Sequence, residues 1–461
     1  MRPGAGKTAI MARALSELVA FGDISGALVV APKKVAQFTW PEELQKFSPE
    51  LRCVFLPETT DTDDIGASVV SVARKADIYV INAESFHRLF GSKILVHPNG
   101  IPLVRGEDPD ENTKVRWHQG PWVRWKHRPN MLVIDESSKL KNPRGQRNQT
   151  LRHYIHHFPR RVIMTGSPTP NHISDIFGQM LLLDDGATLG RELKAFRTRY
   201  MEPYQVKVGE HEFRRWRAKK GAEEFLAGRL SHIATVLDPK DYINFPKRIG
   251  TVRPVRLPPA VLAAYKRAVK DGSMRIDDAA VRMGGGAAAK RRQFASGTMY
   301  TPDGVKQLHT AKYDELVTLL DELGGPALIA YEFDCEGEYL QSKLGCPRIC
   351  GGTKGVGELI DAWNRREIDR LLVQPKGVSH GLNMQYGGSS VIFYTSPWDW
   401  DDVDQLICRL ERQGQPDEHV FAYFLAAAGT TDEAVAKVLA SKEASQAALF
   451  AALKEEAKRE S

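Results

Sequence analysis

The sequence has few cysteines, and this scarcity argues against two classes of protein. Five cysteines occur among 461 residues, an odd number that stand mostly far apart. That pattern is typical of reduced thiols and not of a disulfide framework. Only Cys346 and Cys350 lie near each other, and no second pair follows at the spacing of a zinc site. Ordinary thiols are therefore favoured over a disulfide-rich domain or a zinc-bound one.

Long apolar runs and a large excess of charge are also missing. No apolar stretch approaches the roughly 20 residues of a membrane span, and Arg13 and Glu17 interrupt the first apolar stretch, which argues against a secretory signal. We therefore expect a cytoplasmic protein with no membrane partner. The net charge of +7 is small for this length and indicates no more than a tendency to bind polyanions.

Short apolar runs rich in β-branched residues are what the sequence does contain, and each is followed at once by a polar or Gly/Pro-containing loop. They are residues 27–34, 77–85, 131–138, 161–170, 326–334, 369–383 and 389–400. Continuous apolar strands that alternate with helices predict parallel sheets covered on both faces, an α/β fold. Ligands of such sheets bind at the carboxyl ends of the strands, where the polar loops of these segments fall.

The alternation weakens between about residues 190 and 310, which divides the chain. We predict an N-terminal α/β domain of residues 1–235 with an insertion at about 91–130, a proline-containing connector of 236–255, and a C-terminal α/β domain of 256–461. The second domain is expected to end in a closing helix of about 432–458 that packs on it.

Two aromatic segments lie outside the alternation. The insertion contains Trp117, Trp122 and Trp125, for which a local hydrophobic core is favoured over a surface that stacks on DNA bases. The segment 196–221 is both basic and aromatic.

The first eight residues spell the end of a phosphate-binding loop, formed by Gly4, Ala5, Gly6, Lys7 and Thr8. Glycines let backbone N–H groups approach phosphate, the following helix presents its positive end, the lysine reaches the β- and γ-phosphates, and the threonine can bind magnesium. A glycine-rich start to an ordinary helix is an equal alternative, because Met1 stands where the full pattern has its first glycine. We expect that the chain begins one strand later than this fold normally does.

Asp135 and Glu136 end one of the predicted strands. A nucleotide hydrolase needs two carboxylates there, the first to hold the metal ion and the second to orient and deprotonate the attacking water. An acidic turn after a core strand is the alternative, but the upstream phosphate-binding loop favours the catalytic interpretation. Thr165 and Ser167, in 164–171, either contact the γ-phosphate or simply form a proline-containing turn.

Arg409 and Arg412 stand three residues apart in 405–415 and are expected on one face of a helix. Arginines of this kind stabilise charge in the transition state and contribute about 10³–10⁵ in rate. A solvated basic helix is the alternative, but it leaves the run 413–415 unexplained. Because the second half of the chain has no phosphate-binding loop of its own, the arginines predict a site built across two domains.

Together these stretches resemble the motifs of superfamily-two helicase-like ATPases of the Swi/Snf type, in particular a compact phage-encoded branch. The matching segments are 2–8 for motif I, 28–47 for Ia, 80–86 for Ib, 134–142 for II, 164–171 for III, 327–333 for IV, 379–388 for V and 405–415 for VI. In motif II, Ser137 and Ser138 replace the commoner Ala-His pair.

This resemblance implies two RecA-like parallel-sheet domains in tandem with a nucleotide cleft between them. It also implies ATP and Mg²⁺ as cofactors and movement along double-stranded DNA without regard to sequence, in the host cytoplasm if the chain is phage-encoded. The implied nucleotide-binding residues are Gly4, Ala5, Gly6, Lys7, Thr8, Gly381, Gln405, Arg409 and Arg412. The implied catalytic residues are Lys7, Glu136, Arg409 and Arg412, and the implied metal ligands are Thr8 and Asp135.

In the same family, Gly381, Leu382, Asn383 and Gln385 would couple the state of the nucleotide to DNA contact. Basic residues are expected collectively to bind DNA phosphates, with a solvated surface role as the ordinary alternative for each; they are Lys33, Lys34, Lys139, Lys141, Lys290, Arg291, Arg292 and Lys376. Two other functions stay open. One is an RNA-directed helicase of the same superfamily, and the other is a truncated, hydrolysis-deficient scaffold that binds nucleic acid.

Overall fold

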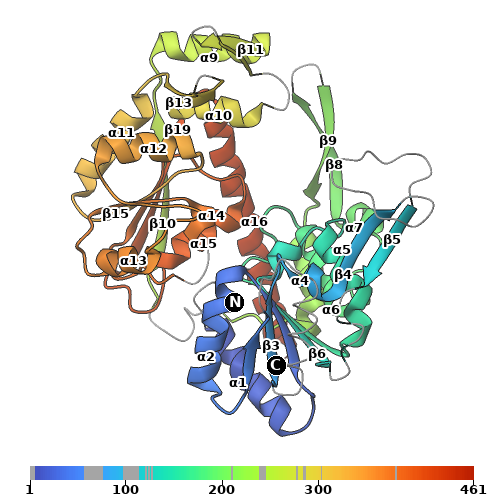
Figure 1. Ribbon diagram of the computed structural model, residues 1–461. Coiled ribbons are helices and arrows are strands. Elements are labelled where there is room, and N and C mark those ends of the chain that lie inside the picture. The colour runs from blue at the N-terminus through green and yellow to red at the C-terminus, as the bar shows by residue number, and fades with distance from the viewer. Residues whose placement is uncertain are drawn as a thin grey trace. The chain divides into compact units, whose positions relative to one another are not determined.

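The computed structural model forms two compact units (Figure 1). It describes residues 6–56, 76–96, 114–119, 122, 125, 128–208, 211–237, 245–276, 279–283, 287–302, 304–378 and 382–460. The first unit comprises residues 6–169 and 174–199, and the second comprises 170–173 and 200–461.

The first unit is built on a parallel five-stranded sheet of order β2-β3-β1-β6-β7. Its strands are β1 (Ala27–Ala31), β2 (Cys53–Phe55), β3 (Ile78–Asn82), β6 (Met131–Asp135) and β7 (Arg160–Met164). All residues of β1, β3 and β6 are buried, as a sheet covered on both faces requires. The four strands predicted for this half are confirmed, and β2 was missed because it has only three residues.

Helices cover both faces of this sheet. On one face, α1 (Lys7–Ala20) and α2 (Trp40–Phe47) place Leu15 and Trp40 against the strands. On the other face lie α4 (Phe86–Phe90) and α5 (Gln146–Tyr154). Further elements of this unit are η1 (Val35–Thr39), η3 (Ser137–Leu140), η4 (Ile155–His157), α6 (Asp175–Asp184), α7 (Leu193–Tyr200) and the antiparallel pair β4 (Gly91–Val96) and β5 (Lys114–Gln119).

Two tryptophans of the predicted insertion belong to the main core of the first unit. Trp122 and Trp125 are 0% and 2% exposed. Trp122 lies 5.0 Å from the ring of Phe158, and Trp125 meets Tyr79 edge-on at 4.6 Å. They therefore extend the core beneath β3 instead of forming a separate one or a DNA-stacking surface. The side chain of Trp117 lies outside the described residues.

The second unit is built on a parallel six-stranded sheet of order β10-β19-β18-β15-β17-β16. Its strands are β10 (Lys247–Val255), β15 (Ala327–Ala330), β16 (Arg348–Ile349), β17 (Arg370–Val373), β18 (Ser390–Phe393) and β19 (His419–Ala427). Helices α11 (Ala311–Leu323) and α12 (Asp334–Leu344) cover one face, and α13 (Val356–Asn364), α15 (Trp400–Leu410) and α16 (Thr431–Glu460) cover the other. An α/β fold with two parallel sheets in tandem is confirmed.

The second sheet begins inside the stretch predicted as a connector. β10 is an edge strand that is mostly exposed and carries four charged or proline residues among nine, so no apolar run announces it. Residues 200–235 group with the second unit, and the predicted domain limits of 235 and 256 stay predictions.

The rest of the second unit surrounds this sheet. Its elements are β8 (Met201–Val208), β9 (His211–Ala218), α8 (Ala222–Leu230), η5 (Ser231–Ile233), α9 (Pro259–Asp271), β11 (Ser273–Ile276), β12 (Ala279–Arg282), α10 (Ala288–Ser296), β13 (Thr298–Thr301), β14 (Gly304–Gln307) and α14 (Pro375–Val378). Val435 and Leu439 of α16 are buried in the core of the second unit. In the described part of the chain, no helix is both long enough and apolar enough to span a bilayer.

Candidate functional site

The N-terminus of α1 begins with a glycine whose backbone conformation demands that residue. Gly6 caps the helix with φ +75°, and a Cβ added there would meet no atom within 4 Å. The left-handed conformation, and not lack of space, therefore favours glycine. The next residue, Lys7, is buried, with 8% of its surface exposed, while Thr8 is half-buried. Gly4 and Ala5 lie outside the described residues.

Lys7 and Glu136 form an ion pair between segments that are far apart in the sequence. Lys7 Nζ lies 3.4 Å from Glu136 Oε1, and the two side chains are 8% and 13% exposed. The first unit thus brings together the phosphate-loop lysine and the acidic motif at the carboxyl edge of its sheet. That edge is where ligands of parallel sheets bind.

Asp135, the last residue of β6, is anchored on both carboxylate oxygens. Trp40 Nε1 donates to Oδ2 at 3.0 Å, and the backbone N–H of Glu136 donates to Oδ1 at 3.0 Å. Burial raises the pKa of Asp135 to about 6, and the neighbouring charge of Glu136 acts in the same direction. Lys7 and the two hydrogen bonds oppose this shift of the pKa. The sequence placed Trp40 in motif Ia but did not place it against Asp135, the predicted metal ligand.

Glu136 adopts a left-handed backbone conformation with φ +51° and ψ +54°. A residue with a Cβ pays roughly 1–2 kcal/mol for this conformation, and such residues concentrate at functional sites. Successive side chains of an extended strand point to opposite faces. The turn at Glu136 breaks that alternation and directs its carboxylate toward Lys7.

A buried glutamine joins the acidic motif to the segment resembling motif III. Ser137 Oγ donates to Gln179 Oε1 at 2.7 Å, and Gln179 Nε2 donates to the carbonyl oxygen of Pro168 at 2.7 Å. Gln179 is fully buried on α6. Sequence reasoning missed this residue, although one amide within the apolar stretch 176–182 was a usable signal. Gln179 therefore contacts both segments through one side chain.

Thr165 and Ser167 form the proline-containing turn that was one of their two interpretations. The hydroxyl oxygen of Thr165 accepts the backbone N–H of Ser167 at 3.0 Å, and Ser167 is 1% exposed. Contact of either residue with a γ-phosphate stays a prediction.

In the second unit, the predicted helical placement of Arg412 is wrong. Helix α15 ends at Leu410, and Glu411 leaves the helix with ψ +75°. Glu411 is held there by Arg248 of β10, which lies 2.5 Å from Glu411 Oε2 and 2.7 Å from Asp404 Oδ1. Arg409 therefore lies on the last turn of α15, whereas Arg412 lies beyond it.

Arg412 joins the segments that resemble motifs V and VI. Its guanidinium group hydrogen-bonds Asn383, and its Nε donates to the carbonyl oxygen of Cys408 at 3.2 Å. Burial lowers the pKa of Arg412. Arg409 is 5% exposed. Contact of either arginine with a nucleotide at Lys7 stays a prediction.

Two other residues, Gln405 and Gly381, are implied to bind the nucleotide. Gln405 is 1% exposed, and neither polar atom of its amide has a hydrogen-bond partner among the described residues. Gly381 lies outside the described residues. The role of both in nucleotide binding stays a prediction.

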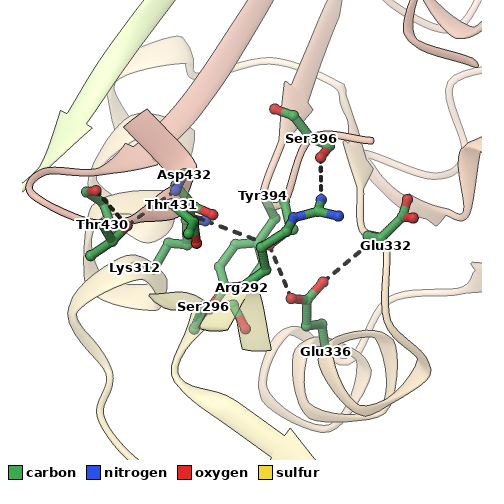
Figure 2. A network of polar contacts seen from close by, with 12 residues as sticks. Arg292, Ser296, Lys312, Glu332, Glu336, Tyr394, Ser396, Thr430, Thr431 and Asp432 are labelled. Carbon is green, nitrogen blue, oxygen red and sulfur yellow. Dashed lines mark hydrogen bonds and ion pairs between the residues drawn. The ribbon is translucent and has the colours of Figure 1, made fainter. Parts of the chain in front are cut away.

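Arg292, expected among the DNA-binding cations, belongs instead to a buried polar network (Figure 2). It is 3% exposed, donates to the carbonyl oxygen of Ser396, and lies 5.3 Å from the ring of Phe333. Because its guanidinium group is enclosed, it cannot face a phosphate backbone in this conformation. By contrast Lys33 and Lys34 are exposed, and the Lys376 side chain is 66% exposed.

The same network buries a lysine between two acids (Figure 2). Lys312 of α11 is fully buried, pairs with Asp432 at the start of α16, and lies 3.5 Å from Thr395 Oγ1. Thr395 in turn donates to Glu336 Oε1 at 3.0 Å. This network connects α10, α11, α12 and α16 behind the carboxyl edge of the second sheet.

The residues around Lys7 fit ATP with magnesium. Thr8 and Asp135 offer oxygen ligands, and one buried lysine faces two carboxylates, so the three side chains carry one net negative charge when ionised. No group of three or more His, Cys, Asp or Glu suited to a metal occurs among the described residues. Magnesium commonly takes one or two protein ligands and completes its shell with phosphate and water.

Parallel sheets that bring a buried lysine beside two carboxylates are an arrangement typical of P-loop nucleotide hydrolases. The SNF2-related domain family matches residues 2–301. The chain therefore belongs to this family of helicase-like ATPases with two RecA-like domains, which confirms the resemblance to the Swi/Snf type.

Two known proteins are similar to this chain over nearly its whole length. A putative protein p41 of Acyrthosiphon pisum secondary endosymbiont phage 1 is 29% identical over 98% of this chain and 93% of its own length. A Sulfolobus solfataricus SWI2/SNF2 ATPase core, solved in complex with dsDNA, is 18% identical, with a TM-score of 0.36 over 99% of this chain and 90% of that chain.

Proposed function

We propose that this protein is an ATP-driven motor that hydrolyses ATP with magnesium, is stimulated by double-stranded DNA and moves along it. The observation that carries the proposal is the Lys7–Glu136 pair, at 3.4 Å, beside the buried carboxylate of Asp135. Membership of the SNF2-related family supports the class of the reaction.

Each residue of the first unit has a role that follows from its chemistry. The N-terminus of α1 and Lys7 bind the phosphates, because both carry positive charge. Thr8 and Asp135 hold the magnesium ion, which neutralises charge on the phosphates when bound. When Lys7 turns to the phosphates, Glu136 loses its partner and its carboxylate becomes available to take a proton from the attacking water.

The second unit would complete the reaction by supplying positive charge. Arg409 and Arg412 stabilise the transition state, a contribution of about 10³–10⁵ in rate for such arginines. Asn383 links Arg412 to the motif V segment, so a change in phosphate contact reaches the residues proposed to couple hydrolysis to DNA.

The test compares ATP turnover of the wild type and Glu136→Gln with no nucleic acid, duplex DNA, single-stranded DNA and duplex RNA. We expect duplex DNA to stimulate most, and Glu136→Gln to lower kcat by about 10²–10⁴ with ATP binding retained, because only the proton acceptor is removed. Glu84→Gln is the matched control, since Glu84 is an exposed acid of the same unit.

The other outcomes identify the alternatives. Wild-type turnover in Glu136→Gln would contradict the assigned base. Stronger stimulation by RNA would favour an RNA-directed helicase, and nucleic-acid binding without turnover would favour the scaffold.

A further inference from the structure

The pair β8 and β9 forms a two-stranded ribbon that belongs to neither parallel sheet (Figure 1). The strands pair with each other from Met201 opposite Ala218 to Val208 opposite His211. An isolated hairpin is only marginally stable in water. This one is anchored at its base, where Met201 is 2% exposed and the backbone N–H of Lys219 donates to Tyr200. Beyond that base, no described side chain of the ribbon is buried.

The exposed side chains of the ribbon are strongly cationic. In the described residues 202–205 and 214–220, one acid, Glu202, stands against five basic residues, which are Arg214, Arg215, Arg217, Lys219 and Lys220. Glu202 pairs with Arg217 at 2.7 Å, and over residues 201–220 the sequence has six basic and three acidic residues, a net charge of +3. Arg215 has no hydrogen-bond or ion-pair partner among the described residues. Charge of this density on a short element is complementary to a polyanion.

The arginines lie on both faces of the ribbon, and two of them rest on aromatic rings. Successive residues of a strand face opposite sides, so Arg214 and Trp216 share one face, while Arg215 and Arg217 share the other with Tyr204. The Arg214 guanidinium group lies 5.2 Å from the Trp216 ring, and that of Arg217 lies 6.0 Å from Tyr204. Aromatic contacts restrict these long side chains, which lowers the entropy lost when they bind.

Positive charge on both faces of the ribbon favours one class of partner. The major groove of a B-form duplex admits a two-stranded β-ribbon and has a phosphate backbone on each side. An acidic peptide or a membrane surface would contact one face and leave the arginines of the other in water. Given the proposed function, on which this inference rests, we propose that the ribbon enters the groove of double-stranded DNA and that Arg214 and Arg215 contact its two phosphate backbones.

The test measures duplex DNA affinity of the full chain by fluorescence anisotropy, without nucleotide, from about 50 to about 200 mM salt. We expect Arg214→Ala/Arg215→Ala to reduce affinity by about tenfold and to reduce the slope of log K against log salt by about 2, since each lost phosphate contact removes about 0.9. The control is Lys266→Ala/Arg267→Ala on α9, which removes the same charge from exposed positions and should change neither quantity to this extent.

Further variants separate charge from folding. Arg214→Lys/Arg215→Lys should restore most of the slope, because lysine keeps the charge and loses the planar stacking. If the double alanine variant does not fold, Arg215→Ala alone should still lower the slope by about 1. ATP turnover without DNA should stay within about twofold of the wild type, because the ribbon contains no residue of the nucleotide site.

Four outcomes overturn the inference: equal effects in the alanine pair and its control, no effect of either, a larger loss with single-stranded DNA than with the duplex, or a larger loss with duplex RNA. Ribbon-dependent DNA binding in a chain that never hydrolyses ATP would refute the proposed function and leave the ribbon assignment intact. DNA-stimulated ATP turnover, with a DNA affinity that does not depend on Arg214 and Arg215, would refute the ribbon assignment and leave the proposed function intact.

Discussion

Both units bury charged side chains, but the charges around Lys7 in the first unit are less balanced than those of the network around Lys312 in the second. In the first unit, Lys7 lies beside Asp135 and Glu136, so one cation serves two carboxylates. The closeness of the two acids is one reason why the pKa of Asp135 rises. The site therefore has negative charge to spare for a bound cation.

Among the buried side chains of the network in the second unit, cations and anions are equal in number. Lys312 and Arg292 accompany Asp432 and Glu336 (Figure 2). Burial also raises the pKa of Glu336, but its Oε2 accepts backbone N–H groups of residues 332 and 333 at 3.1 and 3.3 Å. The buried charges of this network thus compensate one another, although Arg292 Nε has no hydrogen-bond partner among the described residues. The comparison teaches that these two clusters differ in charge balance and not in burial. Imbalance alone does not identify a site, because Arg248 also pairs with two carboxylates, Asp404 and Glu411.

The largest expected effect breaks the balanced network. Lys312→Met should lower the free energy of unfolding of the second unit by about 3–5 kcal/mol, because it leaves buried acids without their cation. Urea unfolding measures the loss. Lys437→Met is the control, since the Lys437 side chain is 76% exposed and its pair with Glu433 should contribute less than about 1 kcal/mol. A loss below about 1 kcal/mol for Lys312→Met would show that the network is not a stability element.

The next effect concerns the unbalanced site and depends on pH. The folded-state pKa of Asp135, about 6, lies above its ordinary value of 3.8, so the folded protein binds this proton more tightly. The aspartate thus destabilises the fold above about pH 6, and the penalty disappears as pH falls toward 4. Asp135→Asn should raise the free energy of unfolding relative to the wild type. This increase should be on the order of 3 kcal/mol larger at pH 7.5 than at pH 4. Urea unfolding of both proteins in EDTA checks this, and a pH-independent difference would contradict it.

The smallest effect refines the same site. Trp40→Phe removes the hydrogen bond to Asp135 Oδ2, which favours the charged form, so the midpoint of the Asp135 pH dependence should rise by up to about one pH unit. The comparison of Trp40→Phe with Trp40→Phe/Asp135→Asn across pH measures this midpoint. Trp363→Phe is the control, because that tryptophan is equally buried and donates a similar bond, at 2.9 Å, to Met384 in the second unit. A shift as large in the control would assign the effect to lost packing.

Much of the fold could be predicted because apolar strands and helical stretches alternate within short windows. The strands at 27–31, 131–135 and 390–393 were all found from their own residues, since a strand buried on both faces is apolar throughout. β10 was missed because an edge strand needs no apolar run. The end of α15 was missed because Glu411, at which the helix ends, is bound by Arg248, more than 150 residues upstream, and no local pattern indicates this contact.

In the candidate site, too, the residues of local motifs could be predicted and their tertiary partners could not. The sequence by itself predicted Lys7, Asp135 and Glu136 as the groups of the site, because a phosphate loop and a carboxylate pair are local patterns, and the structure brings Lys7 and Glu136 together. Only the tertiary structure decided that Trp40 binds Asp135 and that Gln179 joins Ser137 to Pro168. Such partners are chosen by the packing of separate elements, and hydrogen bonds in a buried environment form between groups that no sequence window contains together.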